Sequence, residues 1–351
     1  MGSILFAFLS VEIAVRLLAI GPEFHVIYRE NFQLSDNSVI GYELVPGSPD
    51  GEFTINSAGI RGREIAVNKP DGVFRIAIIG DSISFGHRVH RDQTYAARLE
   101  TLLNRKAAPG AVRYEVLNFG VHGYNVVQVV ETLRVRVVAF DPDLVIYGYV
   151  LNDPQSFSLE GDSLKLMKLK AEESLIQRFS HGISRFLRHS QVFLLLRRPT
   201  IRPPIQPILF AFDPTYRAHR EGWALAFLRS LHQQPETWQR VTVAMAGLAS
   251  IMNSRSFLPI VVAIFPIDSR DGPGRYRLQD VHARIGAEAE RNGLYHLDLA
   301  DVFQQESGRR LFGDFLHPNS RGHEVVAAAL LEWLNGSQLL PETALDLEAS
   351  H

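Results

Sequence analysis

The feature that most constrains the fold is a regular alternation of short apolar segments with longer helix-like segments. The first apolar segment, Phe74 to Ile79, is rich in β-branched residues and ends at Gly80, as a buried parallel strand does. The same pattern predicts further strands at 114–119, 144–147, 259–265 and 295–299, and helices at 93–106, 126–140, 238–252, 278–292 and 321–333. Strict alternation predicts an α/β fold whose parallel sheet is covered on both faces, with ligands bound beyond the carboxyl ends of the strands.

The alternating region does not fill the chain of 351 residues. Residues 21–72 contain turn-forming Pro, Gly, Asn and Ser without a sustained period, which predicts an irregular N-terminal extension. We expect one catalytic domain at 73–337, followed by a C-terminal tail at 338–351. The interval 155–237 is too long for a plain connection, and we expect a helical insertion there. Its apolar and basic residues fit either an amphipathic lid or ordinary helices packed on the sheet.

The first 20 residues are the part of the sequence that indicates where in the cell the protein resides. Ile4 to Ile20 is strongly apolar, but Glu12 and Arg16 interrupt it, and it is shorter than a usual membrane span. It fits either a signal-anchor or a helix that packs on the soluble domain. We expect a protein of the cell envelope, associated with the membrane through residues 4–20, while the cytoplasm stays open as an alternative.

Composition excludes several classes of function. The formal net charge is −2 and the pI is near 6.7, so nothing in the charge balance favours binding to nucleic acid. Cysteine is absent, which removes disulfides, thiolate nucleophiles and cysteine metal sites. The sequence also lacks the HExxH, P-loop and dinucleotide motifs, so it gives no support for a metalloprotease, an NTPase or a dinucleotide-dependent oxidoreductase.

Two motifs predict the parts of a serine nucleophile system. Gly80-Asp81-Ser82 follows the first strand directly, and a serine on such a turn presents its hydroxyl at the carboxyl edge of the sheet. Asp314 and His317 precede the last helix, three residues apart. A carboxylate that accepts the Nδ1 hydrogen of the imidazole fixes the tautomer that can take a proton from the serine. Each motif alone also fits an ordinary turn.

Two more motifs follow the second and third strands. Gly120 has no side chain to obstruct a substrate, so its amide could donate to an oxyanion. Asn152, in Gly148-Tyr149-Val150-Leu151-Asn152-Asp153, could offer a side-chain N–H to the same oxygen. Taken together, the four motifs place a nucleophile, oxyanion donors and an Asp–His pair at one predicted edge of one sheet.

In these four motifs the chain resembles the SGNH (GDSL-type) hydrolase family over about residues 72–335. The resemblance implies a three-layer α/β/α sandwich with a flavodoxin-like sheet, and no metal or organic cofactor. It implies that Ser82 attacks an ester carbonyl, that His317 transfers the proton, and that Asp314 orients His317. The Ser82 N–H, the Gly120 N–H and the Asn152 amide would stabilise the oxyanion. Val150 departs from the family's third motif, which often has glycine there.

Further residues could bind substrate. Ile55 to Gly62 resembles a segment that precedes the catalytic domain in membrane-anchored bacterial members of the family. Arg61 in it could reach the cleft or form a structural salt bridge. Asp81 and His122 are also predicted to contact substrate, and His87 could line the pocket or lie exposed on a loop.

The expected activity is hydrolysis of O-acetyl or short acyl esters of a glycan, lipid or small metabolite. One alternative is an O-acyltransferase that passes the acyl group to a sugar hydroxyl. In polysaccharide acetyltransferases of related fold the Asp–His pair tends to precede the serine, whereas here it follows, which favours hydrolysis. A second alternative is a catalytically silent envelope scaffold. The sequence predicts no oligomeric state.

Overall fold

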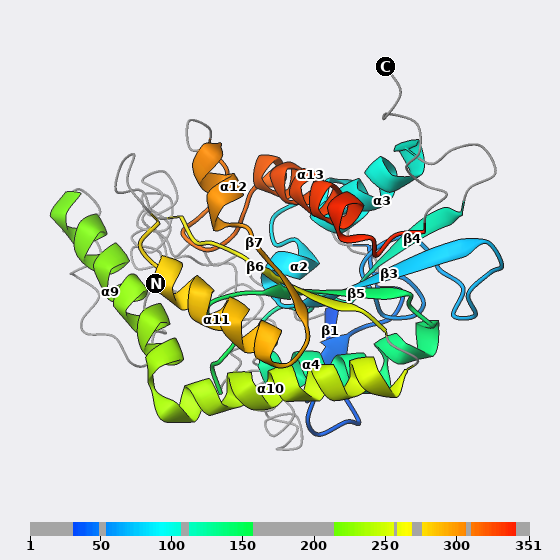
Figure 1. Ribbon diagram of the computed structural model, residues 1–351, viewed down its shortest axis with the longest axis horizontal. Helices are drawn as coiled ribbons and strands as arrows, with labels where there is room; N and C mark the ends of the chain where they lie inside the picture. Colours follow the sequence, from blue (N-terminus) through cyan, green and yellow to red (C-terminus); the bar gives the residue numbers. More distant parts are fainter. Residues whose placement is uncertain are drawn as a thin grey trace, which may run out of the picture. The chain divides into compact units, whose positions relative to one another are not determined.

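The computed structural model of the protein describes residues 31–48, 54–106, 112–156, 214–255, 258–268, 276–306 and 310–341 (Figure 1). The chain divides into two compact units. One comprises Met1–Arg29 and Lys165–Leu225, and only the start of helix α9 (Pro214–Gln233) is described in it. The other comprises Glu30–Leu164 and Ala226–His351 and contains the sheet.

The sheet has five parallel strands in the order β4-β3-β5-β6-β7. Their bounds are Val73–Gly80 for β3, Arg113–Asn118 for β4, Leu144–Tyr149 for β5, Ile260–Ile264 for β6 and Tyr295–Asp298 for β7. Along the chain β3 is the first strand of this sheet and lies inside it, and β4 is the second and lies at its edge, which is the flavodoxin-like order. The predicted strands and the predicted fold class are confirmed.

Helices cover both faces of this sheet, which makes three layers (Figure 1). On one face α3 (Tyr95–Lys106) packs against α13 (Ser320–Ser337), with the short α12 (Ala300–Gln305) beside it. On the other face lie α4 (Val126–Val135), α10 (Pro235–Ser254) and α11 (Gln279–Arg291). Alternate strand residues point to opposite faces, so Ile76 and Ile78 join the core under α3 and α13.

Several elements were not predicted from periodicity because they are short. They are the antiparallel pair β1 (Phe32–Leu34) and β2 (Tyr42–Leu44), the four-residue helix α2 (Ser82–Phe85), and the 3₁₀ turns η2 (Arg91–Gln93) and η3 (Val137–Phe140). The predicted helix 126–140 therefore ends at Val135 and continues as 3₁₀. The interval 155–237 contains all of α9 and the start of α10, and its residues 157–213 lie outside the described residues.

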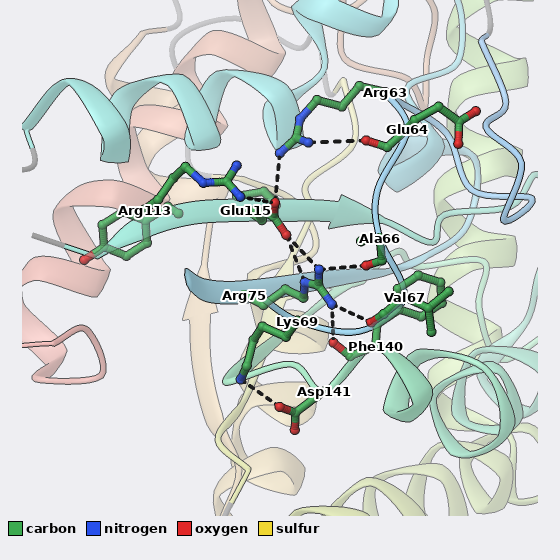
Figure 2. Close-up of polar contacts among 12 residues, drawn as sticks. Arg63, Glu64, Ala66, Val67, Lys69, Arg75, Arg113, Glu115, Phe140 and Asp141 are labelled. Carbon is green, nitrogen blue, oxygen red and sulfur yellow. Dashed lines mark hydrogen bonds and ion pairs between the residues drawn. The ribbon is translucent and has the colours of Figure 1, made fainter. Parts of the chain in front are cut away.

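The buried side chain of Arg75 connects the N-terminal extension to the sheet (Figure 2). The Arg75 side chain on β3 is fully buried and pairs with Glu115 on β4, with Nε–Oε2 and Nη2–Oε2 distances of 3.0 and 2.9 Å. The same guanidinium donates to the carbonyls of Ala66, Val67 and Phe140. Because Ala66 and Val67 belong to the extension, this one side chain links it to the sheet.

The N-terminal apolar segment, residues 1–20, lies outside the described residues. Within the described part of the chain, no helix is both long and apolar enough to cross a bilayer.

The buried side chain of His323 is expected to make the stability of the fold depend on pH. Burial lowers the pKa of His323 to about 3, and the charges of Arg61, Arg98 and His317 act in the same direction. Its Nδ1 accepts the Tyr95 N–H at 3.1 Å, so protonation would also remove an acceptor. Since the unfolded chain binds this proton near pH 6.5, stability should fall as pH drops below that value, by about 1.4 kcal/mol per unit for this group.

His323→Asn tests this prediction, since the amide oxygen can accept the same N–H without titrating. Chemical denaturation at pH 7, 6 and 5 should show a smaller loss of unfolding free energy in the variant than in the wild type. The remaining slope should include His232, whose pKa burial lowers to about 4. Equal losses in the two proteins would contradict a buried neutral His323.

Candidate active site

The turn after β3 presents Ser82 at the carboxyl edge of the sheet. Gly80 has a φ of +150°, and a Cβ there would lie 2.3 Å from Ser84 Oγ and 2.8 Å from the Gly148 carbonyl. Only glycine fits this close approach. Asp81 then caps α2 by accepting the Ile83 N–H at 2.9 Å, and Ser82 is the first helical residue.

The loop before α13 brings the Asp–His pair to the same edge. Asp314 Oδ1 accepts the backbone N–H groups of Leu316 and His317 at 2.9 and 2.8 Å, which folds the loop into a tight turn. The Gly313 N–H donates to the His317 carbonyl at 2.9 Å and closes it. Asn319 caps α13 by accepting the Gly322 N–H. The three-residue spacing therefore lets one carboxylate hold both the turn and the imidazole.

Ser82, His317 and Asp314 lie in hydrogen-bond contact. Ser82 Oγ is 2.9 Å from His317 Nε2, and His317 Nδ1 is 3.0 Å from both Asp314 oxygens. Burial acts to raise the pKa of Asp314, but the hydrogen bond and charge of His317 and two backbone N–H groups outweigh it. The pKa therefore lies well below its usual value. An ionised Asp314 holds the His317 proton on Nδ1, which leaves Nε2 as an acceptor for the serine hydroxyl.

The backbone N–H of Gly120 already has an acceptor within its own loop. It donates to Asn118 Oδ1 at 3.0 Å, so in this arrangement it does not point to an oxyanion. Gly120 is instead a packing site, because a Cβ there would lie 2.2 Å from the backbone nitrogen of Phe85 in α2. Asn118 also bonds the Ser84 carbonyl through Nδ2 at 2.8 Å. Residues 118–120 therefore support the helix that carries Ser82.

Gly123, three residues further on, was missed by sequence reasoning. It has a φ of +73°, it is partly exposed, and none of the described residues accepts a hydrogen bond from its N–H. Its loop lies beside the nucleophile turn, since the Val121 N–H donates to the Gly80 carbonyl at 3.1 Å. The glycine in Val121-His122-Gly123 was the available signal. The side chain of Asn152 donates a hydrogen bond to Asp81, the residue before Ser82.

Replacing Gly120 with alanine should destabilise the protein and disturb the site. The added methyl would meet backbone atoms of Ser84 and Phe85, which cannot move without α2. We expect a loss of about 3 kcal/mol in unfolding free energy and a lower rate of ester turnover. Gly336→Ala in α13 is the matched control, because nothing lies within 4 Å of its Cβ position. Equal denaturation midpoints for Gly120→Ala and wild type would contradict this packing.

Two predicted substrate contacts have structural roles instead. Arg61 is buried, and its guanidinium donates to the carbonyls of Phe85, Gly86 and Val89. Asp81 is fully buried beneath Ser82 as the cap of α2. Burial raises its pKa, although hydrogen bonds from the Ile83 N–H, Asn152 and Ser82 and the charge of His317 oppose the rise. Neither side chain is open to a ligand.

The two histidines form a row with His317. The His87 ring lies 4.5 Å from the His317 ring and 4.9 Å from the His122 ring, measured between centroids. His122 is only 6% exposed, and burial together with the charges of His87, His317 and Arg61 lowers its pKa well below the usual value. His122 is thus a neutral part of the wall of the site, while His87 is half-buried at its rim.

One group of potential metal ligands exists among the described residues. Donor atoms of His87, Asp314 and His317 lie within 4.8 Å of one another. However, Asp314 already accepts hydrogen bonds from His317 Nδ1 and pairs with the Arg88 guanidinium at 3.4 Å. A fixed positive charge beside the one carboxylate disfavours a second cation. We therefore interpret this group as a hydrogen-bonded Asp–His pair with His87 beside it.

Comparison with known proteins identifies the family. Residues 78–325 match the model of the GDSL-like Lipase/Acylhydrolase family. The chain belongs to this family and is a carboxylic ester hydrolase. A search of curated protein sequences finds no match.

Solved structures with a similar chain path include esterases. A two-domain esterase active on acetylated mannans is 14% identical, with a TM-score of 0.43, and the match covers 75% of this chain but 49% of that one. An acetylxylan esterase from Geobacillus stearothermophilus is 17% identical, with a TM-score of 0.41 and coverages of 77% and 97%. A lipase/acylhydrolase from Enterococcus faecalis is 15% identical, with a TM-score of 0.40 and coverages of 75% and 96%.

Proposed function

We propose that the chain hydrolyses esters through an acyl-enzyme formed on Ser82. The observation that carries this proposal is the 2.9 Å contact between Ser82 Oγ and His317 Nε2, with Asp314 on the opposite ring nitrogen. Nucleophile, base and orienting carboxylate stand in the order that the reaction requires. All three lie at the carboxyl edge of the sheet, where ligands of this fold bind.

In the first half of the reaction Ser82 Oγ attacks the ester carbonyl while its proton passes to His317 Nε2. The tetrahedral intermediate collapses as the imidazolium returns the proton to the departing alcohol, and the acyl group stays on Ser82. Water then gives its proton to Nε2 and attacks the acyl carbonyl. A second collapse releases the acid and restores the serine hydroxyl.

The negative charge on the tetrahedral oxygen needs fixed donors. We assign them to the backbone N–H groups of Ser82 and Gly123 and to the Asn152 side chain. None of the described residues accepts a hydrogen bond from either backbone group, so both are available to the oxyanion. Asn152 donates a hydrogen bond to Asp81 and would turn its amide to the oxyanion. Each such donor contributes about 3 kcal/mol in well-studied hydrolases.

The proposed substrates are O-acetyl or other short acyl esters of glycans, lipids or small metabolites. A panel of aryl esters of increasing acyl length, together with acetylated glycans, would define both the acyl and the alcohol component. Ser82→Ala serves as the control for background hydrolysis. Release of free acid in amounts equal to the alcohol formed supports hydrolysis. Recovery of the acyl group on an added glycan would show the alternative activity, O-acyl transfer.

We also propose that the protein resides in the cell envelope, held at the membrane through residues 4–20. The apolar character of this segment supports the proposal. Fractionation of cells that express the full chain or a chain lacking residues 1–20 would test it. Full-length protein found in the soluble cytoplasmic fraction would overturn it.

A further inference from the structure

The turn that contains Gly123 adopts one of two forms that share the same ends. The Tyr124 N–H donates to the Val121 carbonyl at 3.3 Å and closes a β-turn, in which Gly123 at the third position has a φ of +73°. His122 at the second position has a negative φ, so the turn is of type II. A type I turn would differ mainly by a half rotation of the central peptide, which joins His122 to Gly123.

A hydroxyl from the N-terminal extension bonds this central peptide. Tyr42 lies on β2, its side chain is fully buried, and its hydroxyl donates to the His122 carbonyl at 2.6 Å. In a trans peptide the carbonyl and the N–H that follows it point in opposite directions. Because the carbonyl faces the buried hydroxyl, the Gly123 N–H faces away from the Tyr42 side chain. A change to the type I form would break the bond to Tyr42.

Several contacts keep the Tyr42 ring in place against the loop. The Tyr124 hydroxyl donates to the Tyr42 carbonyl at 2.6 Å, and the two rings meet edge to face with their centroids 5.2 Å apart. The Phe32 ring on β1 lies 6.0 Å from the Tyr42 ring. Gln128 Nε2 on α4 donates to the Ile40 carbonyl at 2.7 Å. The pair β1 and β2 therefore does not depend on any single one of these contacts for its position.

We propose that Tyr42 is a positioning residue for the oxyanion donor Gly123. Its hydroxyl keeps the turn in the type II form and so fixes the direction of the Gly123 N–H before substrate binds. This inference rests on the proposed function, in which Gly123 stabilises the tetrahedral oxygen. A donor of this kind is most effective when its direction is set before the charge develops. The N-terminal extension thereby takes part in catalysis through one side chain.

Tyr42→Phe and Tyr124→Phe form a matched pair for the test. Each substitution removes one buried hydroxyl and one hydrogen bond of 2.6 Å between β2 and the loop, and each keeps the aromatic ring. Their midpoints of chemical denaturation should therefore fall by similar amounts. The bond lost in Tyr42→Phe holds the peptide between His122 and Gly123, whereas the bond lost in Tyr124→Phe does not involve this peptide.

The two variants should differ in kcat. Loss of a whole oxyanion donor costs about 10²–10³ in kcat, so a donor that is misdirected in part of the molecules should cost about 10- to 100-fold. We expect this loss for an aryl acetate in Tyr42→Phe, with KM changed only a few-fold, because the donor acts in the transition state. Tyr124→Phe should keep kcat within a few-fold of the wild type. Equal losses of kcat in the two variants, or an unchanged kcat in Tyr42→Phe, would overturn the inference.

A measurement without turnover observes the Gly123 amide itself. A phosphonate adduct on Ser82 places a phosphoryl oxygen where the oxyanion would form, and the Gly123 amide resonance can be identified by its loss in Gly123→Ala. This resonance should move downfield on labelling in the wild type and in Tyr124→Phe, and clearly less in Tyr42→Phe. A full shift in Tyr42→Phe, or no shift in the wild type, would overturn the inference. Failure of the proposed function would instead appear as ester turnover that survives Ser82→Ala.

Discussion

Replacing Ser82 with alanine is expected to lower kcat for an aryl acetate by at least about 10⁴-fold, with little change in fold. The substitution removes the Oγ that lies 2.9 Å from His317 Nε2 and thus the atom that would carry the acyl group. A loss of that size corresponds to about 5 kcal/mol of transition-state stabilisation. What remains should reflect the oxyanion donors and binding alone.

Ser84→Ala provides a matched control for this result. Ser84 lies two residues further along the same short helix, is fully buried, and bonds the Tyr95 hydroxyl at 2.8 Å rather than a member of the site. Its loss should cost stability but leave kcat within about one order of magnitude. Ser82→Ala protein that turns over ester at the wild-type rate would eliminate the serine mechanism.

Replacing His317 with glutamine should be nearly as damaging, because glutamine offers no basic nitrogen to Ser82. We expect kcat to fall by about 10⁴-fold or more, with KM changed far less. Ser82 and His317 act as one unit, so the double variant Ser82→Ala/His317→Gln should be no slower than the worse single variant. Steady-state kinetics of the three proteins on one ester measures this directly.

Additive losses in that comparison would mean that the two side chains act in separate steps. Retention of activity in His317→Gln would point to another base, and His87 is the candidate among the described residues because its ring lies 4.5 Å from His317. His87→Gln in the same assay distinguishes the two, since it should leave the Ser82-dependent rate within a few-fold of wild type.

The architecture of the sheet could be predicted because buried parallel strands carry a strong local signal. The run Phe74 to Ile79 has β-branched residues on both faces and ends at a glycine, and the structure places β3 there. The pair β1 and β2 could not be predicted in this way, since three residues are too few to show a period. Its ends depend on turn geometry and on contacts such as the bond from Tyr42 to the His122 carbonyl.

The arrangement of Ser82, Asp314 and His317 could be predicted from their order along the chain, because parallel strands bring their carboxyl ends to one edge. Details of hydrogen bonding could not. Whether the Gly120 N–H already has an acceptor depends on the Asn118 side chain two residues away. Which carbonyls accept hydrogen bonds from the Arg61 guanidinium depends on a loop that begins 24 residues later in the chain. Tertiary packing determines these hydrogen-bond partners, and it leaves no local pattern in the sequence.

The most direct test of the serine mechanism is covalent labelling of Ser82. A fluorophosphonate reacts only with a serine whose hydroxyl is activated by a base, and peptide mass spectrometry locates the adduct. We predict a single adduct on Ser82 in the wild type, none in Ser82→Ala, and much slower labelling in His317→Gln. An adduct on a different residue, or an active enzyme that takes no label while it hydrolyses ester, would contradict Ser82 as the nucleophile.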